Sequence, residues 1–210
     1  FILSDGMGKG RKAAAGSRAV VNRLRRDLKG GMSVVRSIRE VNRHMIETEP
    51  GREDFATVDL TILDPVKRKA KFYKMGAGAS FVVRENRVRK IQHPALPVGM
   101  VPKLQLTHTL VQLKPGDRII MVSDGITEAD RQDMSGQWLI DFLKTLSSGN
   151  CEWDRTEAVP GPRKLAAMIL AEAESFYGCR ERDDLTVAVI YIEEDKAETE
   201  DFERKLKKIP

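Results

Sequence analysis

The chain has 210 residues, of which 41% are hydrophobic and 6% aromatic, so it can bury one sizeable core and we expect a single domain. Charged residues make up 32% of the chain and are mixed in sign, which excludes wholesale disorder. The net charge of +5 would attract a phosphate-bearing substrate, a nucleic acid or an acidic membrane face, and it does not distinguish among them.

No apolar run approaches the roughly 18 residues needed to cross a bilayer, and no signal peptide is recognisable. Cys151 and Cys179 lie far apart without metal-ligand spacing. This usage is typical of a reduced intracellular protein, and we assign the two cysteines no role.

The chain begins inside an apolar strand that ends at Asp5, so we expect further chain upstream. The glycine-rich residues 6–10 are unsuited to regular structure. Apolar residues at helical spacing then predict a helix over 11–29, which two consecutive glycines end. A second helix is predicted over about 33–47.

From residue 55 the apolar period changes to two, which predicts strands. Short connections between them favour hairpins and antiparallel pairing. Because several strands are apolar on both faces, the sequence predicts an α+β fold, an antiparallel β-sandwich flanked by helices. The predicted strands cover about 55–62, 69–75, 80–85, 87–91, 104–113 and 118–123.

Helices return at about 136–147 and 162–177, and a last strand over 186–192 completes the predicted domain, residues 1–192. The tail, 193–210, is highly charged and carries an apolar stripe. We expect a solvated helix or disorder there, with partner docking as the alternative.

Three aspartates stand at the ends of apolar strands. Asp5 and Asp124 each lie in a Ser-Asp-Gly step after a strand, and the Asp183-Asp184 step leads into the last strand. Asp-Gly alone is ordinary turn chemistry, but together the three steps predict one site. Since clustered carboxylates repel one another, a divalent cation among them is the economical explanation. Only one of Asp183 and Asp184 is expected to be a ligand, because consecutive side chains point apart.

The predicted donors are all oxygens, which favours Mg²⁺ or Mn²⁺. Zinc is disfavoured because His44, His93 and His108 are isolated in the sequence. Two metals bridged by one carboxylate can hold a hydroxide and stabilise both the attacking and the leaving oxygen in phosphate-ester hydrolysis.

The motifs in order resemble those of metal-dependent PPM-type serine/threonine phosphatases, and among these the bacterial sporulation stage II protein E (SpoIIE) branch. The resemblance spans about 1–192 and implies the PPM β-sandwich, with its N-terminal strands upstream of this chain. It rests on Asp-Gly-Met-Gly at 5–8, Ser-Asp-Gly-Ile at 123–126, Asp-Asp-Leu-Thr at 183–186, Gly-Ala-Gly-Ala-Ser at 76–80 and Leu-Pro-Val-Gly at 96–99.

The resemblance implies that Asp5 bridges two Mn²⁺ or Mg²⁺ ions, that the Gly6 carbonyl binds the first, and that Asp124 and Asp183 complete the second. The bridging hydroxide would attack phosphorus in line, without a phosphoenzyme. Met7 stands where many relatives have a histidine general acid, so the leaving oxygen needs another proton source. The family also has an acidic residue upstream of Asp5. We therefore expect weak metal binding and low activity unless a longer chain restores it.

The resemblance further implies a phosphoserine substrate on a regulatory protein, a phosphorylated anti-anti-sigma factor acting in sporulation, and a regulatory role for the helices over about 11–47. We expect a cytoplasmic domain without a nucleic-acid partner. A membrane anchor in the full-length protein and a homodimer are left open.

Two alternatives remain. One is a non-catalytic interaction module of the same fold, in which the acidic steps are structural turns. The other is nucleotide binding through residues 6–10, a weak match because neither Gly-Lys-Ser/Thr nor G-x-G-x-x-G is present.

Overall fold

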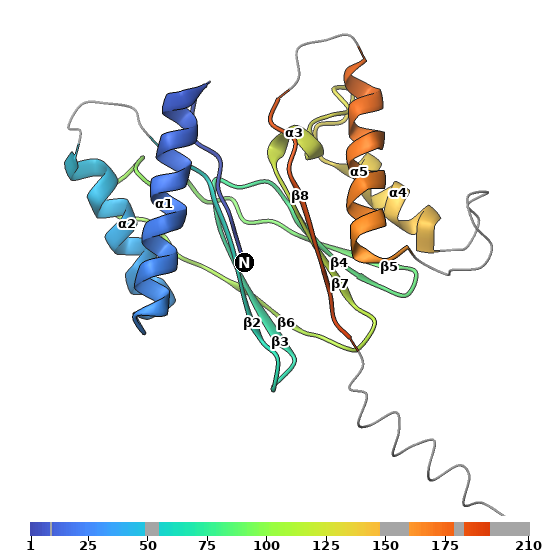
Figure 1. Cartoon of the computed structure of the whole chain (residues 1–210), viewed down its shortest axis with the longest axis horizontal. Coiled ribbons are helices and arrows are strands. Elements are labelled where there is room, and N and C mark those ends of the chain that lie inside the picture. Colours follow the sequence, from blue (N-terminus) through green and yellow to red (C-terminus); the bar gives the residue numbers. More distant parts are fainter. Residues whose placement is uncertain (9, 49–54, 148–159, 179–182, 194–210) are drawn as a thin grey trace, which may run out of the picture.

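The computed structural model of the protein describes residues 1–8, 10–48, 55–147, 160–178 and 183–193. Two four-stranded antiparallel sheets face each other, and helices lie on the outer side of each sheet (Figure 1). The predicted α+β sandwich is thereby confirmed. Cys151, Cys179 and the tail beyond Glu193 lie outside the described residues, so the expectations for them stay predictions.

The first sheet is covered by the two N-terminal helices, α1 (Arg11–Lys29) and α2 (Val34–Thr48). Its strand order is β1-β2-β3-β6. Val20 and Leu24 of α1 and Ile38 and Val41 of α2 are buried against this sheet, in line with the helical spacing of the sequence. The strands are β1 (Ile2–Leu3), β2 (Val58–Asp64), β3 (Lys69–Met75) and β6 (Thr109–Gln112).

The second sheet is covered by α4 (Gln137–Ser147) and α5 (Pro162–Tyr177). Its order is β5-β4-β7-β8. The strands are β4 (Ser80–Arg84), β5 (Arg87–Ile91), β7 (Arg118–Val122) and β8 (Val187–Tyr191).

Among the described residues, no helix is both long and apolar enough to span a membrane.

A third core lies between the two sheets. Because side chains alternate along a strand, Ile119 and Met121 of β7 belong to this middle layer, whereas Ile120 and Val122 belong to the core beneath α4 and α5. Phe72 of β3 is fully buried in the middle layer. Apolar residues on both faces of a strand thus indicate burial on both sides, as the sequence predicts.

Two short connections are not hairpins, and here the prediction is wrong. Residues 76–79 carry the chain from β3 in the first sheet to β4 in the second, and residues 113–117 carry it from β6 to β7 in the same way. A strand that is apolar on both faces can be buried in either sheet, so a short loop does not decide its partner.

Two further elements differ from the prediction. The strand expected over 104–113 pairs only over Thr109–Gln112, because Leu104 and Leu106 pack against the core beneath α1 and α2 without joining the sheet. A short helix, α3 (Asp124–Thr127), was not predicted, since four residues carry no readable period. It begins at one of the three aspartates.

Candidate metal centre

Asp5 lies just beyond the end of β1, where the chain turns towards α1. Its backbone N–H donates to Thr57 Oγ1 at 2.9 Å, and the Thr57 N–H donates to the Asp5 carbonyl at 2.7 Å. A Cβ on Gly6 would lie 2.1 Å from the carbonyl oxygen of Ala13 in the first turn of α1. Glycine is therefore required for the helix to pass this close to the residue after Asp5.

Asp124 lies at the start of α3, directly after β7. The Gly125 N–H donates to Asp124 Oδ1 at 2.9 Å, and the Glu128 N–H donates to the Asp124 carbonyl at 2.8 Å. A carboxylate in the first helical turn is stabilised by the positive end of the helix dipole. The second Ser-Asp-Gly step thus ends a strand, as predicted, and also begins a helix.

The segment holding Asp183 is attached to the Asp124 turn through Ser123. The Ser123 hydroxyl donates to the Asp184 carbonyl at 2.7 Å and accepts the Thr186 N–H at 2.9 Å. A Cβ on Gly125 would lie 2.8 Å from the Asp184 carbonyl oxygen and 3.1 Å from Asp183 Cβ. Two motifs about 60 residues apart in sequence therefore meet at one glycine.

The Asp5 carboxyl is affected by the charges of the other two acidic motifs. Burial raises the pKa of the Asp5 carboxyl, and the negative charges of Asp124, Asp183 and Asp184 raise this pKa further. A hydrogen bond from the Gly6 backbone opposes the shift in part. The three predicted aspartates thus repel one another across one region of the protein.

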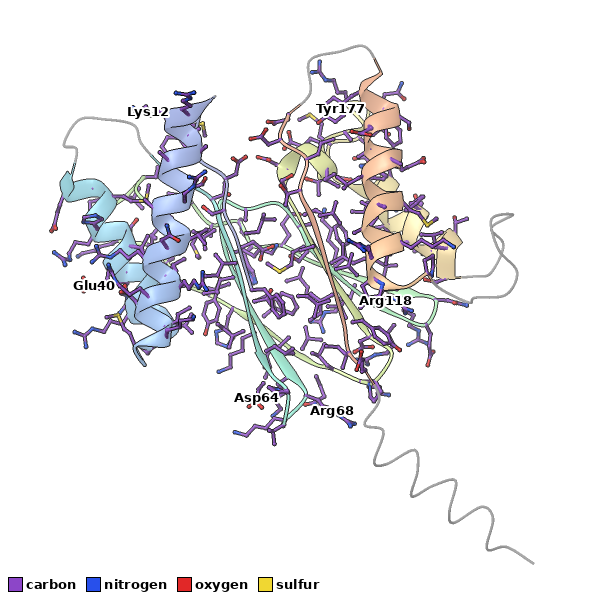
Figure 2. All side chains as sticks on the ribbon, in the orientation of Figure 1. Lys12, Glu40, Asp64, Arg68, Arg118 and Tyr177 are labelled. Carbon is purple, nitrogen blue, oxygen red and sulfur yellow. The ribbon has the colours of Figure 1, made fainter. Side chains whose placement is uncertain are left out.

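Two residues at this site have no signal in the motifs. Burial raises the pKa of Glu128, with further contributions from Asp124 and Asp183. Tyr177 lies at the end of α5 (Figure 2), and its hydroxyl donates to the Gly125 carbonyl at 2.7 Å. Burial and then the charge of Asp183 raise the pKa of Tyr177, so this phenol stays protonated and donates.

Glu128 lies one helical turn after Asp124, and this i+4 spacing is the only sequence signal that could have indicated Glu128 as a residue of the site.

The donor chemistry at the site suits a hard divalent cation better than zinc. His93 is bonded to Thr109 Oγ1 at 2.9 Å, and His108 lies beside the Tyr73 ring, with centroids 5.2 Å apart. Neither histidine is among the groups whose charges or hydrogen bonds shift the pKa of the Asp5 carboxyl. In the part of the chain that the structure describes, no three His, Cys, Asp or Glu side chains stand close enough to form a ready metal cluster. The carboxylates share a region but do not close into a ligand shell, so the ligand set stays a prediction.

A small cavity lies beneath the carboxylates, between the two sheets. Asp5 and Asp124 line it together with Asp59 and Gly78. The volume open to a water-sized molecule is about 10 Å³, near the limit of roughly 10–15 Å³ for one water.

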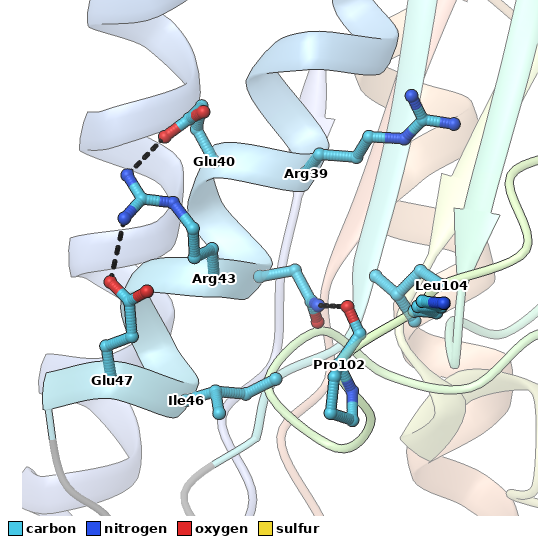
Figure 3. A pocket seen from close by; sticks show the side chains of 9 residues that line it. Arg39, Glu40, Arg43, Ile46, Glu47, Pro102 and Leu104 are labelled. Atoms are coloured by element: carbon cyan, nitrogen blue, oxygen red, sulfur yellow. Dashed lines mark hydrogen bonds and ion pairs between the residues drawn. The ribbon is translucent and has the colours of Figure 1, made fainter.

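A larger groove of about 510 Å³ lies elsewhere, between α2 and residues 102–104 (Figure 3). Its two glutamates, Glu40 and Glu47, are both bonded to Arg43, at 2.7 and 2.8 Å. None of the predicted ligands lines this groove. The small cavity, and not the large groove, therefore belongs to the candidate metal centre.

Residues 1–193 match the family described as Stage II sporulation protein E (SpoIIE). The chain belongs to the SpoIIE family. The chain is 29% identical to stage II sporulation protein E of Bacillus subtilis over 91% of its own length and 22% of that protein. It is 27% identical to the Priestia megaterium protein of the same name, over 90% of its own length and 30% of the relative. The chain therefore spans between a fifth and a third of these SpoIIE relatives.

A solved structure of the PP2C phosphatase domain of SpoIIE from B. subtilis, with a fragment of its regulatory domain, has the same fold. It superposes with a TM-score of 0.79 at 28% identity, covering 93% of this chain and 53% of that one. The predicted resemblance to PPM-type phosphatases close to SpoIIE is thus confirmed for both family and fold.

Proposed function

We propose that this SpoIIE-family chain is a metal-dependent phosphoprotein phosphatase that hydrolyses phosphoserine on a regulatory protein. The observation that carries the proposal is that Asp5 and Asp124 line one cavity while Asp183 lies beside Gly125. Burial and then the charges of Asp124 and Asp183 raise the pKa of Asp5. Carboxylates gathered without an ion pair to any described residue are suited to divalent cations.

In this proposal Asp5, the Gly6 carbonyl, Asp124 and Asp183 hold two Mn²⁺ or Mg²⁺ ions. When bound, such ions polarise phosphoryl oxygens and lower the pKa of coordinated water. The chain's own contribution is to orient the carboxylates. Ser123 and Gly125 fix the Asp183 segment against the Asp124 turn, and Tyr177 fixes the Gly125 carbonyl.

The proposed substrate is a phosphorylated regulatory protein of the anti-anti-sigma type. Support comes from the relatives alone, since a B. subtilis neighbour is described as the cell fate determinant SpoIIE. We propose that the domain acts in the cytoplasm and binds no nucleic acid, and that the full-length protein has a membrane anchor or forms a homodimer.

Phosphatase assays on a phosphoserine peptide with and without Mn²⁺ test the proposal. We expect Mn²⁺-dependent release of phosphate that Asp124→Asn abolishes. Asp141→Asn is the matched control, because Asp141 is an exposed aspartate of α4 with a surface partner, Lys144. Equal activity in both variants, or turnover independent of metal, would contradict the proposal. Because the family has a further acidic residue upstream, the assay should include a chain extended at its N-terminus, which we expect to be faster.

A non-catalytic module of the same fold is the second candidate, and metal binding separates it from the first. In such a module the Ser123 and Gly125 contacts would be structural only. Mn²⁺ would then have no effect on the unfolding of the wild-type protein.

We also propose that α1 and α2 regulate the site. The first turn of α1 contacts Gly6. Val41 of α2 is buried in the core between the two helices and the first sheet. Val41→Ser should change turnover without removing any ligand. Unchanged turnover in a folded Val41→Ser protein would argue against regulation by these helices.

A further inference from the structure

A buried polar network crosses the middle layer directly beneath the candidate metal centre. Asp59 of β2 and Lys74 of β3 are register partners, with side-chain exposures of 1% and 0%. Lys74 Nζ donates to Asp59 Oδ2, to Ser80 Oγ and to the Gly78 carbonyl, each at 2.7 Å. The Ser80 hydroxyl donates to Asp59 Oδ2 at 2.6 Å. Since Ser80 belongs to β4, the network joins the two sheets.

Stability alone does not explain this network. Removing two charges from water costs about as much as their attraction returns, and apolar pairs of similar volume are often equally stable. Apart from Thr61 of β2, the middle layer around the network is built from apolar residues such as Phe72, Ile119 and Met121. The network therefore differs from its surroundings at the one end of the sandwich where the candidate site lies.

The network is connected to the candidate ligands in two ways. First, Lys74 Nζ holds the Gly78 carbonyl, and a Cβ on Gly78 would lie 3.5 Å from both the Asp124 backbone nitrogen and Thr127 Oγ1. The 76–79 segment therefore packs against the first turn of α3. Second, Asp59 lines the small cavity together with Asp5 and Asp124. Asp59 Oδ1 is buried and has no hydrogen-bond partner among the described residues.

We propose that Asp59, Lys74 and Ser80 are positioning residues that hold the 76–79 segment, and through it Asp124, in the arrangement that binds metal. Asp59 Oδ1 then accepts a hydrogen bond from a donor in the small cavity. This bond connects the network to the cavity that Asp5 and Asp124 also line. The inference rests on the proposed metal-dependent function but concerns residues that none of the three acidic motifs contains.

The chain offers a matched control at the other end of β7. Asp117 is fully buried and is bonded by Arg84 through two nitrogen atoms, each at 2.7 Å. Asp117 precedes β7 and Asp124 follows it, so the two lie at opposite ends of one strand. Asp59→Asn and Asp117→Asn therefore remove the same charge from equally buried aspartates, near the candidate site and far from it, although the Arg84 partner of Asp117 is more exposed than Lys74.

The experiment measures Mn²⁺ binding to both variants by isothermal titration calorimetry, well below their unfolding temperatures. We expect Asp59→Asn to weaken Mn²⁺ binding about 10–100-fold, the usual effect of removing support behind metal ligands. Asp117→Asn should leave Mn²⁺ affinity within about threefold of wild type. Equal affinities in the two variants would overturn the proposal. If Asp59→Asn does not fold, Ser80→Ala replaces it, since it keeps the Lys74–Asp59 pair and removes only the link to β4.

Amide hydrogen exchange in metal-free protein separates this inference from the proposed function. Faster exchange of the Gly125 to Glu128 amides in Asp59→Asn, but not in Asp117→Asn, supports positioning even if the wild type binds no Mn²⁺. Unchanged exchange at these amides overturns positioning even if Mn²⁺ binding proves the metal centre. The two proposals can therefore fail separately.

Discussion

Two sets of carboxylates in this protein differ in burial and in pairing: Asp59 and Asp117 are buried, whereas Asp5 and Asp124 are half-buried and Asp183 is exposed. Asp59 and Asp117 are each paired with a cation of the chain, Lys74 and Arg84, at 2.7 Å. Asp5, Asp124 and Asp183 have no ion pair within the described residues, and the pKa of Asp5 is raised by burial and by the other two. The protein thus supplies its own cation for each of the two buried carboxylates. For the other three carboxylates the described residues supply no cation, and in our proposal a bound metal ion compensates their charge.

The largest expected effect comes from breaking a paired carboxylate. Lys74→Met leaves Asp59 charged and uncompensated in the middle layer, so the free energy of unfolding should fall by about 3–5 kcal/mol. Urea denaturation measures this loss. The exposed Lys144→Met, which removes a 3.6 Å surface pair, should cost less than about 1 kcal/mol. Similar losses of unfolding free energy in Lys74→Met and Lys144→Met would show that the buried ion pair matters no more to stability than the surface pair.

Binding of Mn²⁺ should have the next largest effect on the free energy of unfolding. Mn²⁺ at about 100 times its dissociation constant should raise the free energy of unfolding by about 2.7 kcal/mol, because it binds the folded protein only. Thermal unfolding with Mn²⁺ and with a chelator measures the difference. The stabilisation should disappear in Asp124→Asn and persist in Asp141→Asn. Stabilisation that survives in Asp124→Asn would place the bound ion elsewhere.

Substitution of Gly125 by alanine should lower the free energy of unfolding by somewhat less. The added methyl of Gly125→Ala would stand 2.8 Å from the Asp184 carbonyl oxygen, so the Asp183 segment has to move. Such overpacking costs about 1–3 kcal/mol, and Mn²⁺ affinity should fall with it. Gly161→Ala has open space around the added methyl and should leave Mn²⁺ affinity unchanged. An unaltered affinity in Gly125→Ala would show that the Asp183 segment holds no ligand.

The smallest expected effect is a gain in stability. The raised pKa of Asp5 means that its ionised form destabilises the metal-free protein above that pKa, and that this cost is relieved as the pH falls towards the ordinary value of 3.8. Asp5→Asn should therefore stabilise metal-free protein at neutral pH by roughly 0.5 kcal/mol, the scale of screened interactions.

The pH dependence gives the sign of the Asp5 effect. The difference in unfolding free energy between Asp5→Asn and wild type should shrink to zero as the pH is lowered below about 4. A difference that grows towards low pH would contradict repulsion among these carboxylates.

Much of the architecture was predictable because periodicity and turn chemistry are local. α1 and α5 have the predicted bounds, and β3 and β5 agree to the residue. The sheet that each strand joins was not predictable, because β4 and β7 are apolar on both faces and a short loop fits either sheet. The three acidic motifs did indicate one region of the protein.

The network beneath the site was missed although the sequence contained a signal. The Asp64-Pro65 turn sets the register of the hairpin between β2 and β3, and this register places Asp59 opposite Lys74. A buried pair could be suspected from two opposite charges at paired positions of apolar strands. The contact with Ser80 could not, because it depends on how the two sheets pack.

Anomalous X-ray diffraction from crystals soaked in Mn²⁺ would locate the bound ions themselves. We expect Mn²⁺ peaks bound by the carboxylates of Asp5, Asp124 and Asp183, with Asp59 and Asp117 still paired to Lys74 and Arg84. Peaks elsewhere, or a site without bound Mn²⁺ in which these three carboxylates are neutralised by side chains of the chain itself, would contradict the proposed metal centre.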